Sequence, residues 1–169
     1  LHGSGKLKSD FVVLPEDVLI EVFMQRHIPE NYMSHENLRL SFYKSLSSAQ
    51  GMEEIDKIQY HLANRFGPLP LPVKNLIQEC RLRILAAQVG VLSLRVRGCG
   101  VVCKIMQNDS AEFITSVLEY MGRFFAEQGV DFHLLPKSGA VMLACIHIPH
   151  KTDKYTLLSL FLDKFKALA

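Results

Sequence analysis

The sequence predicts an α+β domain, with an N-terminal strand and three-helix unit followed by a small mixed or antiparallel sheet that carries two helices. One change of pattern, at Gly90, predicts this class. Up to Gly90 most apolar residues recur at intervals of three and four, the spacing of helices that bury one face. Beyond Gly90 they first alternate with polar residues, which is typical of half-buried strands. Hydrophobic residues make up 49% of the 169 residues and charged residues 21%, so the chain can bury a core.

The same change of pattern divides the chain. Residues 1–18 are expected to form a partly flexible N-terminal extension, and residues 19–90 the strand and the helical unit. Residues 91–169 have the order strand–strand–helix twice, a ββαββα pattern. We expect these parts to form one compact domain.

In the first half, residues 19–25 alternate loosely and predict a strand. Ser34 is the expected N-cap of a first helix, which Gly51 ends. The second helix opens with acidic residues, and its apolar stripe has helical spacing. The stripe comprises Ile55, Ile58, Leu62 and Phe66.

Glycine and proline mark the next boundary. Gly67 is the expected left-handed cap of the second helix, and Pro72 is expected in the first turn of the third. The apolar residues of the third helix surround a wide arc, which predicts burial on more than one side. They are Val73, Leu76, Ile77, Cys80, Ile84, Leu85 and Val89.

In the second half, the expected strands cover residues 92–96, 101–106, 130–134 and 140–148, with the last central in the sheet because it is apolar on both faces. Asp109 and Glu112 form a predicted capping box. Residues 98–100 and 136–139 are expected turns, and Gly129 ends the fourth helix. Its expected core face comprises Ile114, Val117, Leu118, Met121 and Phe125. A final helix is expected from about Thr152, with Leu158, Phe161, Leu162, Phe165 and Leu168 facing inward.

Charge and hydropathy exclude several classes of protein. The net charge is +2, from 19 Lys and Arg against 17 Asp and Glu, which argues against a dedicated nucleic-acid-binding domain. The longest strongly apolar stretch, 140–146, is too short to cross a bilayer, so no membrane is expected. Four cysteines spread through packable segments indicate a reduced, cytoplasmic chain.

No pattern of catalytic, cofactor-binding or metal-binding residues stands out. The Gly98–Gly100 turn leads into a strand and lacks the Lys-Ser/Thr pair of a phosphate loop. A zinc set of Cys99, Cys103, His147 and His150 is disfavoured, because residues four apart on a strand lie roughly 13 Å apart.

Two alternatives stay open at this point. One is a small ligand-binding or hydrolytic domain that uses His147, His150 and Cys103 around a cleft between the halves. The other is an accessory nucleic-acid-binding domain whose basic patch comprises Arg81, Arg83, Arg95 and Arg97.

Residues 28–76 carry a more specific signal. Four short motifs follow one another in order: Ile28-Pro29-Glu30-Asn31-Tyr32, Arg39-Leu40-Ser41-Phe42-Tyr43-Lys44, Asn64-Arg65-Phe66-Gly67-Pro68-Leu69-Pro70 and Val73-Lys74-Asn75-Leu76. In residue type, order and spacing they resemble the terminal domain of bacterial transcription-repair coupling factors. Beyond about Gly90 the resemblance is only one of length and pattern.

The resemblance implies a regulatory docking domain without catalytic activity of its own. The full proteins of that family are ATP-driven DNA translocases that displace stalled RNA polymerase and recruit the repair protein UvrA. The terminal domain is implied to dock on the N-terminal repair module and to hide its UvrA-binding surface until RNA polymerase is engaged. RNA polymerase and DNA would be bound by other domains, and no small-molecule substrate or cofactor is implied for this one.

The expected docking residues lie on the first two helices. They are Arg39, Tyr43, His61, Asn64 and Arg65. Arg39 and Tyr43 lie four apart on one helix face, where arginine can stack or pair with a carboxylate. The family commonly has acidic residues where this chain has His61 and Asn64, so the docking contact is expected to differ here in strength and geometry.

Overall fold

The structure is a computed structural model that describes residues 13–22, 24–97, 100–106, 111–135, 141–148 and 153–166. In these residues a short 3₁₀ turn at Pro15–Asp17 leads into the strand β1, and three helices follow. Two strand pairs then alternate with two helices, in the predicted ββαββα order. The elements are β1 (Leu19–Glu21), α1 (Glu36–Ser48), α2 (Met52–Phe66), α3 (Leu71–Gln88), β2 (Val91–Arg97), β3 (Gly100–Met106), α4 (Ala111–Glu127), β4 (Asp131–Leu135), β5 (Val141–His147) and α5 (Lys154–Lys166).

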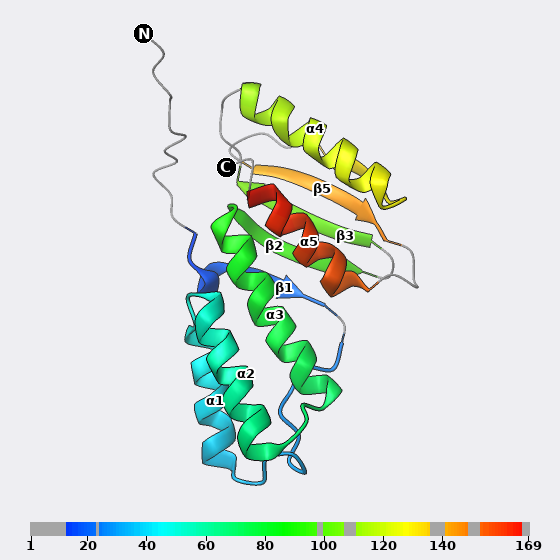
Figure 1. Ribbon diagram of the computed structural model, residues 1–169. Coiled ribbons are helices and arrows are strands. Elements are labelled where there is room, and N and C mark those ends of the chain that lie inside the picture. The colour runs from blue at the N-terminus through cyan, green and yellow to red at the C-terminus, as the bar shows by residue number, and fades with distance from the viewer. Residues whose placement is uncertain are drawn as a thin grey trace.

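The strands form one mixed sheet in the order β1-β2-β3-β5-β4. Figure 1 labels β1, β2, β3 and β5 of this sheet. β1 runs parallel to β2, and the other neighbours are antiparallel. β5 therefore lies between two strands, as its apolar run predicted. The position of β1 in this sheet was not predicted. This strand precedes the helical unit in the chain but belongs to the sheet of the second half.

Two hydrophobic clusters fill the structure. One is formed by α1, α2 and one side of α3, and includes Ile55, Leu62 and Ile77. The other lies between the sheet and the helices α3, α4 and α5, and includes Leu82 and Phe161. α3 contributes to both clusters, which confirms that it is buried on more than one side and explains how it joins the two halves.

The start of the chain differs from the prediction in two places. Only three residues of β1 pair with β2, because the chain then leaves the sheet towards α3, where Asn75 Nδ2 donates to the Gln25 carbonyl at 2.9 Å. Ser34 is not the N-cap of α1. That position belongs to His35, whose side chain makes no capping bond, and the Ser34 carbonyl accepts from Arg39 instead.

The boundaries of α2 and α3 follow the glycine and proline signals closely. Pro72 lies in the first turn of α3, as predicted. Gly67 caps α2 with φ +86° and ψ −166°. The positive φ was predicted, but this ψ is outside the left-handed helical region that the prediction named.

The second half shows where periodicity misled the prediction. A register shift between Val91 and Ser93 buries Ser93, while Leu92 is only half-buried. On α4, Leu118 is 40% exposed although it was expected inside. In the C-terminal part of this helix Phe124, which was not predicted, is buried with Met121 and Phe125.

α5 begins at Lys154, and Asp153 caps it by accepting from the backbone N–H groups of Tyr155 and Thr156. Tyr155 and Leu157 join the predicted Leu158, Phe161 and Leu162 in the core. Other predictions fall outside the described part of the chain: residues 1–12, the turns at 98–99 and 136–139, Asp109, Thr152, Leu168 and the side chains of Ile114, Val117 and Phe165.

One charged group inside α3 was not predicted. Glu79 is only 5% exposed, and its carboxylate pairs with Arg26 and with Arg83. An Arg83 nitrogen lies 3.1 Å from Glu79 Oε1, and Arg26 Nε faces Glu79 Oε2. Desolvation by burial raises the pKa of Glu79, and the two arginines oppose that rise. This ion-pair group ties the segment after β1 to α3.

Candidate docking groove

The loop between β1 and α1 is fixed to the helices by side chains from the resemblance motifs. Arg39 on α1 donates to the Met33 carbonyl at 2.6 Å and to the Ser34 carbonyl at 3.1 Å, and pairs with Glu30 at 3.4 Å. The carboxylate partner expected for Arg39 is therefore present. Tyr43 Oη accepts the Ile28 N–H at 2.6 Å. Both residues hold the loop in place, and direct contact with a partner stays a prediction for them.

A shallow groove of about 390 Å³ lies between α1 and α2. It is lined by Phe42 and Ser45 from α1 and by Ile58, His61, Asn64 and Arg65 from α2. Three of the five predicted docking residues thus lie together, and all three are exposed. Tyr43 lines a separate hollow between α1 and α3, and Arg39 lines neither.

Aromatic packing beneath the groove makes it rigid. The Phe66 ring lies 6.2 Å from that of Phe42, edge to face, and 5.8 Å from that of Tyr32. The Arg65 guanidinium lies over the Phe66 ring at 5.4 Å. Tyr32 Oη lies 3.0 Å from the carbonyls of both Leu62 and Gly67, so it also fixes the end of α2.

The chemistry of the groove suits protein contact. Half-buried Phe42 and Ile58 offer an apolar floor, and the rim has one permanent cation, Arg65, and one imidazole, His61. None of the described residues that line it carries a carboxylate. Ile58 was predicted only as part of an apolar stripe, because periodicity identifies a face but not the gap left between two neighbouring helices.

Cys103 and His147, the described residues of the catalytic alternative, do not come together. Cys103 is completely buried on the sheet face that packs against the helices, and this burial raises the pKa of its thiol to about 12. His147 is exposed, and its partner in the β3–β5 ladder is Gly100, whereas Cys103 is paired with Ala144. Cys99 and His150 lie outside the described residues. Within the described ranges, no three His, Cys, Asp or Glu side chains could together hold a metal ion.

The arginine patch is largely neutralised by carboxylates. Arg81 pairs with Asp56, Arg83 with Glu79, and Arg95 with Glu21. The side chain of Arg97 is outside the described part of the structure. Over that part, no helix is long and apolar enough to span a membrane.

Comparison with known proteins gives a consistent result. A family model described as the TRCF domain matches residues 22–115. The chain is similar to transcription-repair-coupling factors from Haemophilus influenzae (37% identity over 75 residues, 44% of this chain), Borreliella burgdorferi (32% over 117 residues, 68% of this chain) and Escherichia coli (33% over 90 residues, 53% of this chain). The matches cover only 6%, 10% and 8% of these relatives.

The fold has a counterpart among solved structures. The crystal structure of the C-terminal domain of a transcription-repair coupling factor superposes with a TM-score of 0.72 at 16% sequence identity. The superposition covers 90% of this chain and 95% of that one. The similarity therefore extends over both halves of the fold, whereas the family model ends within α4.

Proposed function

The chain belongs to the TRCF domain family of transcription-repair coupling factors, and we propose that it serves there as a non-catalytic docking module. Its partner is the N-terminal repair module of the same protein, whose UvrA-binding surface it covers until RNA polymerase is engaged. The exchange between covered and uncovered states is a two-state switch that the bound polymerase biases. RNA polymerase and DNA are bound by other domains.

The observation that carries this proposal is the groove between α1 and α2. Three residues predicted for docking meet there on an aromatic support, next to an apolar floor. An apolar floor with a polar rim is the usual composition of a protein interface. No comparable set of catalytic groups is assembled among the described residues.

The test is the binding of the N-terminal repair fragment to this chain, measured by calorimetry. Wild type should bind, and the double variant His61→Glu, Asn64→Asp should bind more tightly if the fragment presents a basic surface. Because both positions are exposed, the gain should be about 1 kcal/mol or less, and it should shrink as salt rises.

A matched control adds two acidic residues elsewhere. Gln78→Glu with Ser116→Glu changes two exposed helical positions outside the groove and should leave affinity unchanged. Equal effects of both double variants, or no effect of either, would remove the groove from the interface. If only the groove variant binds more weakly, the groove is still part of the interface, but the partner surface that faces His61 is acidic and not basic.

A further inference from the structure

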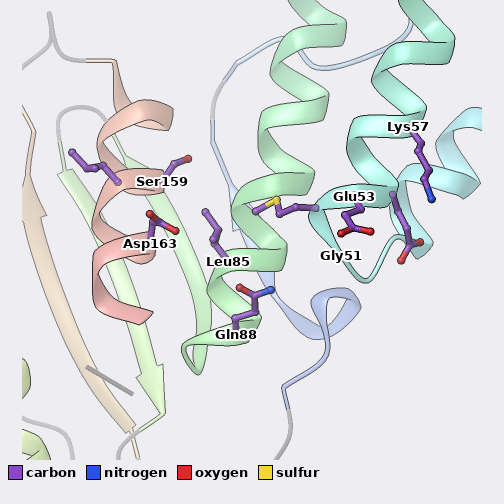
Figure 2. Close-up of a pocket in the computed structure, with 10 residues that line it drawn as sticks. Gly51, Glu53, Lys57, Leu85, Gln88, Ser159 and Asp163 are labelled. Carbon is purple, nitrogen blue, oxygen red and sulfur yellow. The ribbon is translucent and has the colours of Figure 1, made fainter. Parts of the chain in front are cut away.

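A second, larger hollow lies at the junction of the two halves. It has a volume of about 740 Å³ and runs between the start of α2, the end of α3 and the last turns of α5. Figure 2 shows Leu85 and Gln88 of α3 between Ser159 and Asp163 of α5 on one side and Glu53 of α2 on the other. We call this hollow the junction cleft. None of the residues proposed for catalysis lines it.

The floor of the junction cleft is apolar. Met52 and Leu85 are half-buried, and Leu160 remains 39% exposed although its neighbours Phe161 and Leu162 are fully buried. An exposed leucine alone needs no explanation, but an apolar floor shared by three helices is a typical position for an anchoring side chain of a partner.

The rim of the cleft is acidic and not neutralised. Glu53, Glu54 and Asp163 line it, and Lys57 is the one cation among its described lining residues. None of these carboxylates forms an ion pair within the described residues, whereas Glu21, Glu30, Asp56 and Glu79 all do.

The helices explain only part of this charge. Glu53 and Glu54 lie in the first turn of α2, where the helix dipole favours carboxylates, and Glu54 also accepts the Gln50 N–H at 3.3 Å. Asp163 lies near the C-terminal end of α5, where the dipole disfavours a carboxylate. A cation from outside would offset that cost.

We propose that the junction cleft binds a basic amphipathic peptide segment of a partner protein. The segment places an apolar side chain on Met52, Leu85 and Leu160, and its lysine or arginine side chains face Glu53 and Asp163. This surface is separate from the α1–α2 groove, since the two share no lining residue and only the cleft is acidic. The inference therefore does not depend on the proposed function.

The experiment uses a labelled amphipathic helical peptide of about 14 residues, four turns, with leucines on one face and lysines on the other. A second peptide has glutamate in place of each lysine. Fluorescence anisotropy with the wild-type chain should show binding of the basic peptide only. Glu53→Gln with Asp163→Asn should weaken it about five- to tenfold at low salt.

The matched control is Glu127→Gln with Asp131→Asn, which removes the same charge from exposed positions outside the cleft. It should leave binding within about twofold of wild type. Leu160→Ala, which keeps the charge, should also weaken binding, and His61→Glu should not. Equal weakening by both charge variants would mean that the peptide is attracted only by the net charge of the chain, and would overturn the proposal. Equal binding of the two peptides would also overturn it.

Discussion

Three tyrosine hydroxyls in the structure have three different environments. Tyr32 Oη lies between two carbonyls at the end of α2, and Tyr43 Oη accepts the Ile28 N–H. Tyr155 is 5% exposed, and its hydroxyl has no hydrogen-bond partner among the described residues. Burial raises the pKa of Tyr155 to about 12, and Glu79 adds to the rise.

These environments predict different effects of the same change. Tyr32→Phe and Tyr43→Phe should each lower the free energy of unfolding by about 1–2 kcal/mol, because both leave a polar backbone group without its partner. Tyr155→Phe should be neutral, or stabilising by up to about 1 kcal/mol, because it removes a buried hydroxyl that forms no hydrogen bond with the described residues. Urea unfolding of the three variants measures this. A loss at Tyr155 as large as at Tyr32 would mean that the phenol has a partner after all.

At this scale the sequence revealed which residues share a helix face but not what they contact. Arg39 and Tyr43 lie on one face of α1 as predicted, but most of their partners are backbone groups of residues 28–34. Asn75 and Glu79 interrupt an apolar helix, and nothing local shows that Gln25 and Arg26 lie opposite them. Such contacts depend on where a loop returns, which local pattern does not encode.

At the scale of elements, glycine and proline were the most reliable signals. Pro72 lies at the expected boundary, whereas Gly51, expected to end α1, is the N-cap of α2, three residues after the last residue of α1. Strand alternation was less reliable, because one register shift in β2 buries Ser93, whereas Leu92, which was expected inside, is only half-buried. The core face of α4 was predicted correctly at Met121 and Phe125 but not at Leu118, which is 40% exposed.

Two glycines give a matched prediction for helix α2 and helix α4. A Cβ at Gly67 would meet no atom within 4 Å, so the cost of Gly67→Ala comes from the backbone alone. Its φ of +86° and ψ of −166° are adopted almost only by glycine, and the variant should lose about 1–3 kcal/mol. Gly122 lies inside α4 with open space around it, and Gly122→Ala should gain about 0.5–1 kcal/mol.

Thermal unfolding of the two alanine variants compares them directly. Opposite shifts in Tm are expected. Because Gly67 also closes the helix that carries the groove, Gly67→Ala should weaken binding of the repair fragment, while Gly122→Ala should not. A stabilised Gly67→Ala would show that the end of α2 relaxes to another cap.

For the whole molecule, the sequence predicted the class of fold and the order of its elements, because the hydrophobic period changes at Gly90. It did not predict that β1 pairs in parallel with β2, since the three helices separate the two strands in the chain. The junction cleft was not predicted either, because its lining comes from α2, α3 and α5, and α5 lies far from the other two in the chain. Three lining residues of the groove, His61, Asn64 and Arg65, were named from the sequence because they lie together near the end of α2, but the groove itself was not predicted.

Charge distribution over the whole molecule leads to the last prediction. The net charge is +2, and three of the four arginines of the predicted patch are paired with carboxylates. We therefore expect weak binding to duplex DNA that disappears as salt rises from about 50 to 150 mM, because few phosphate contacts would form. Fluorescence anisotropy with a labelled duplex measures this.

The variant Glu21→Gln, Asp56→Asn removes the carboxylate partners of Arg95 and Arg81 and should strengthen DNA binding at low salt by a few fold. Neutralising Glu112 and Glu127, which are exposed on α4, should strengthen it less. A submicromolar complex of the wild-type chain that survives 150 mM salt would contradict the docking interpretation, because such a complex needs phosphate-binding cations that these ion pairs leave unavailable.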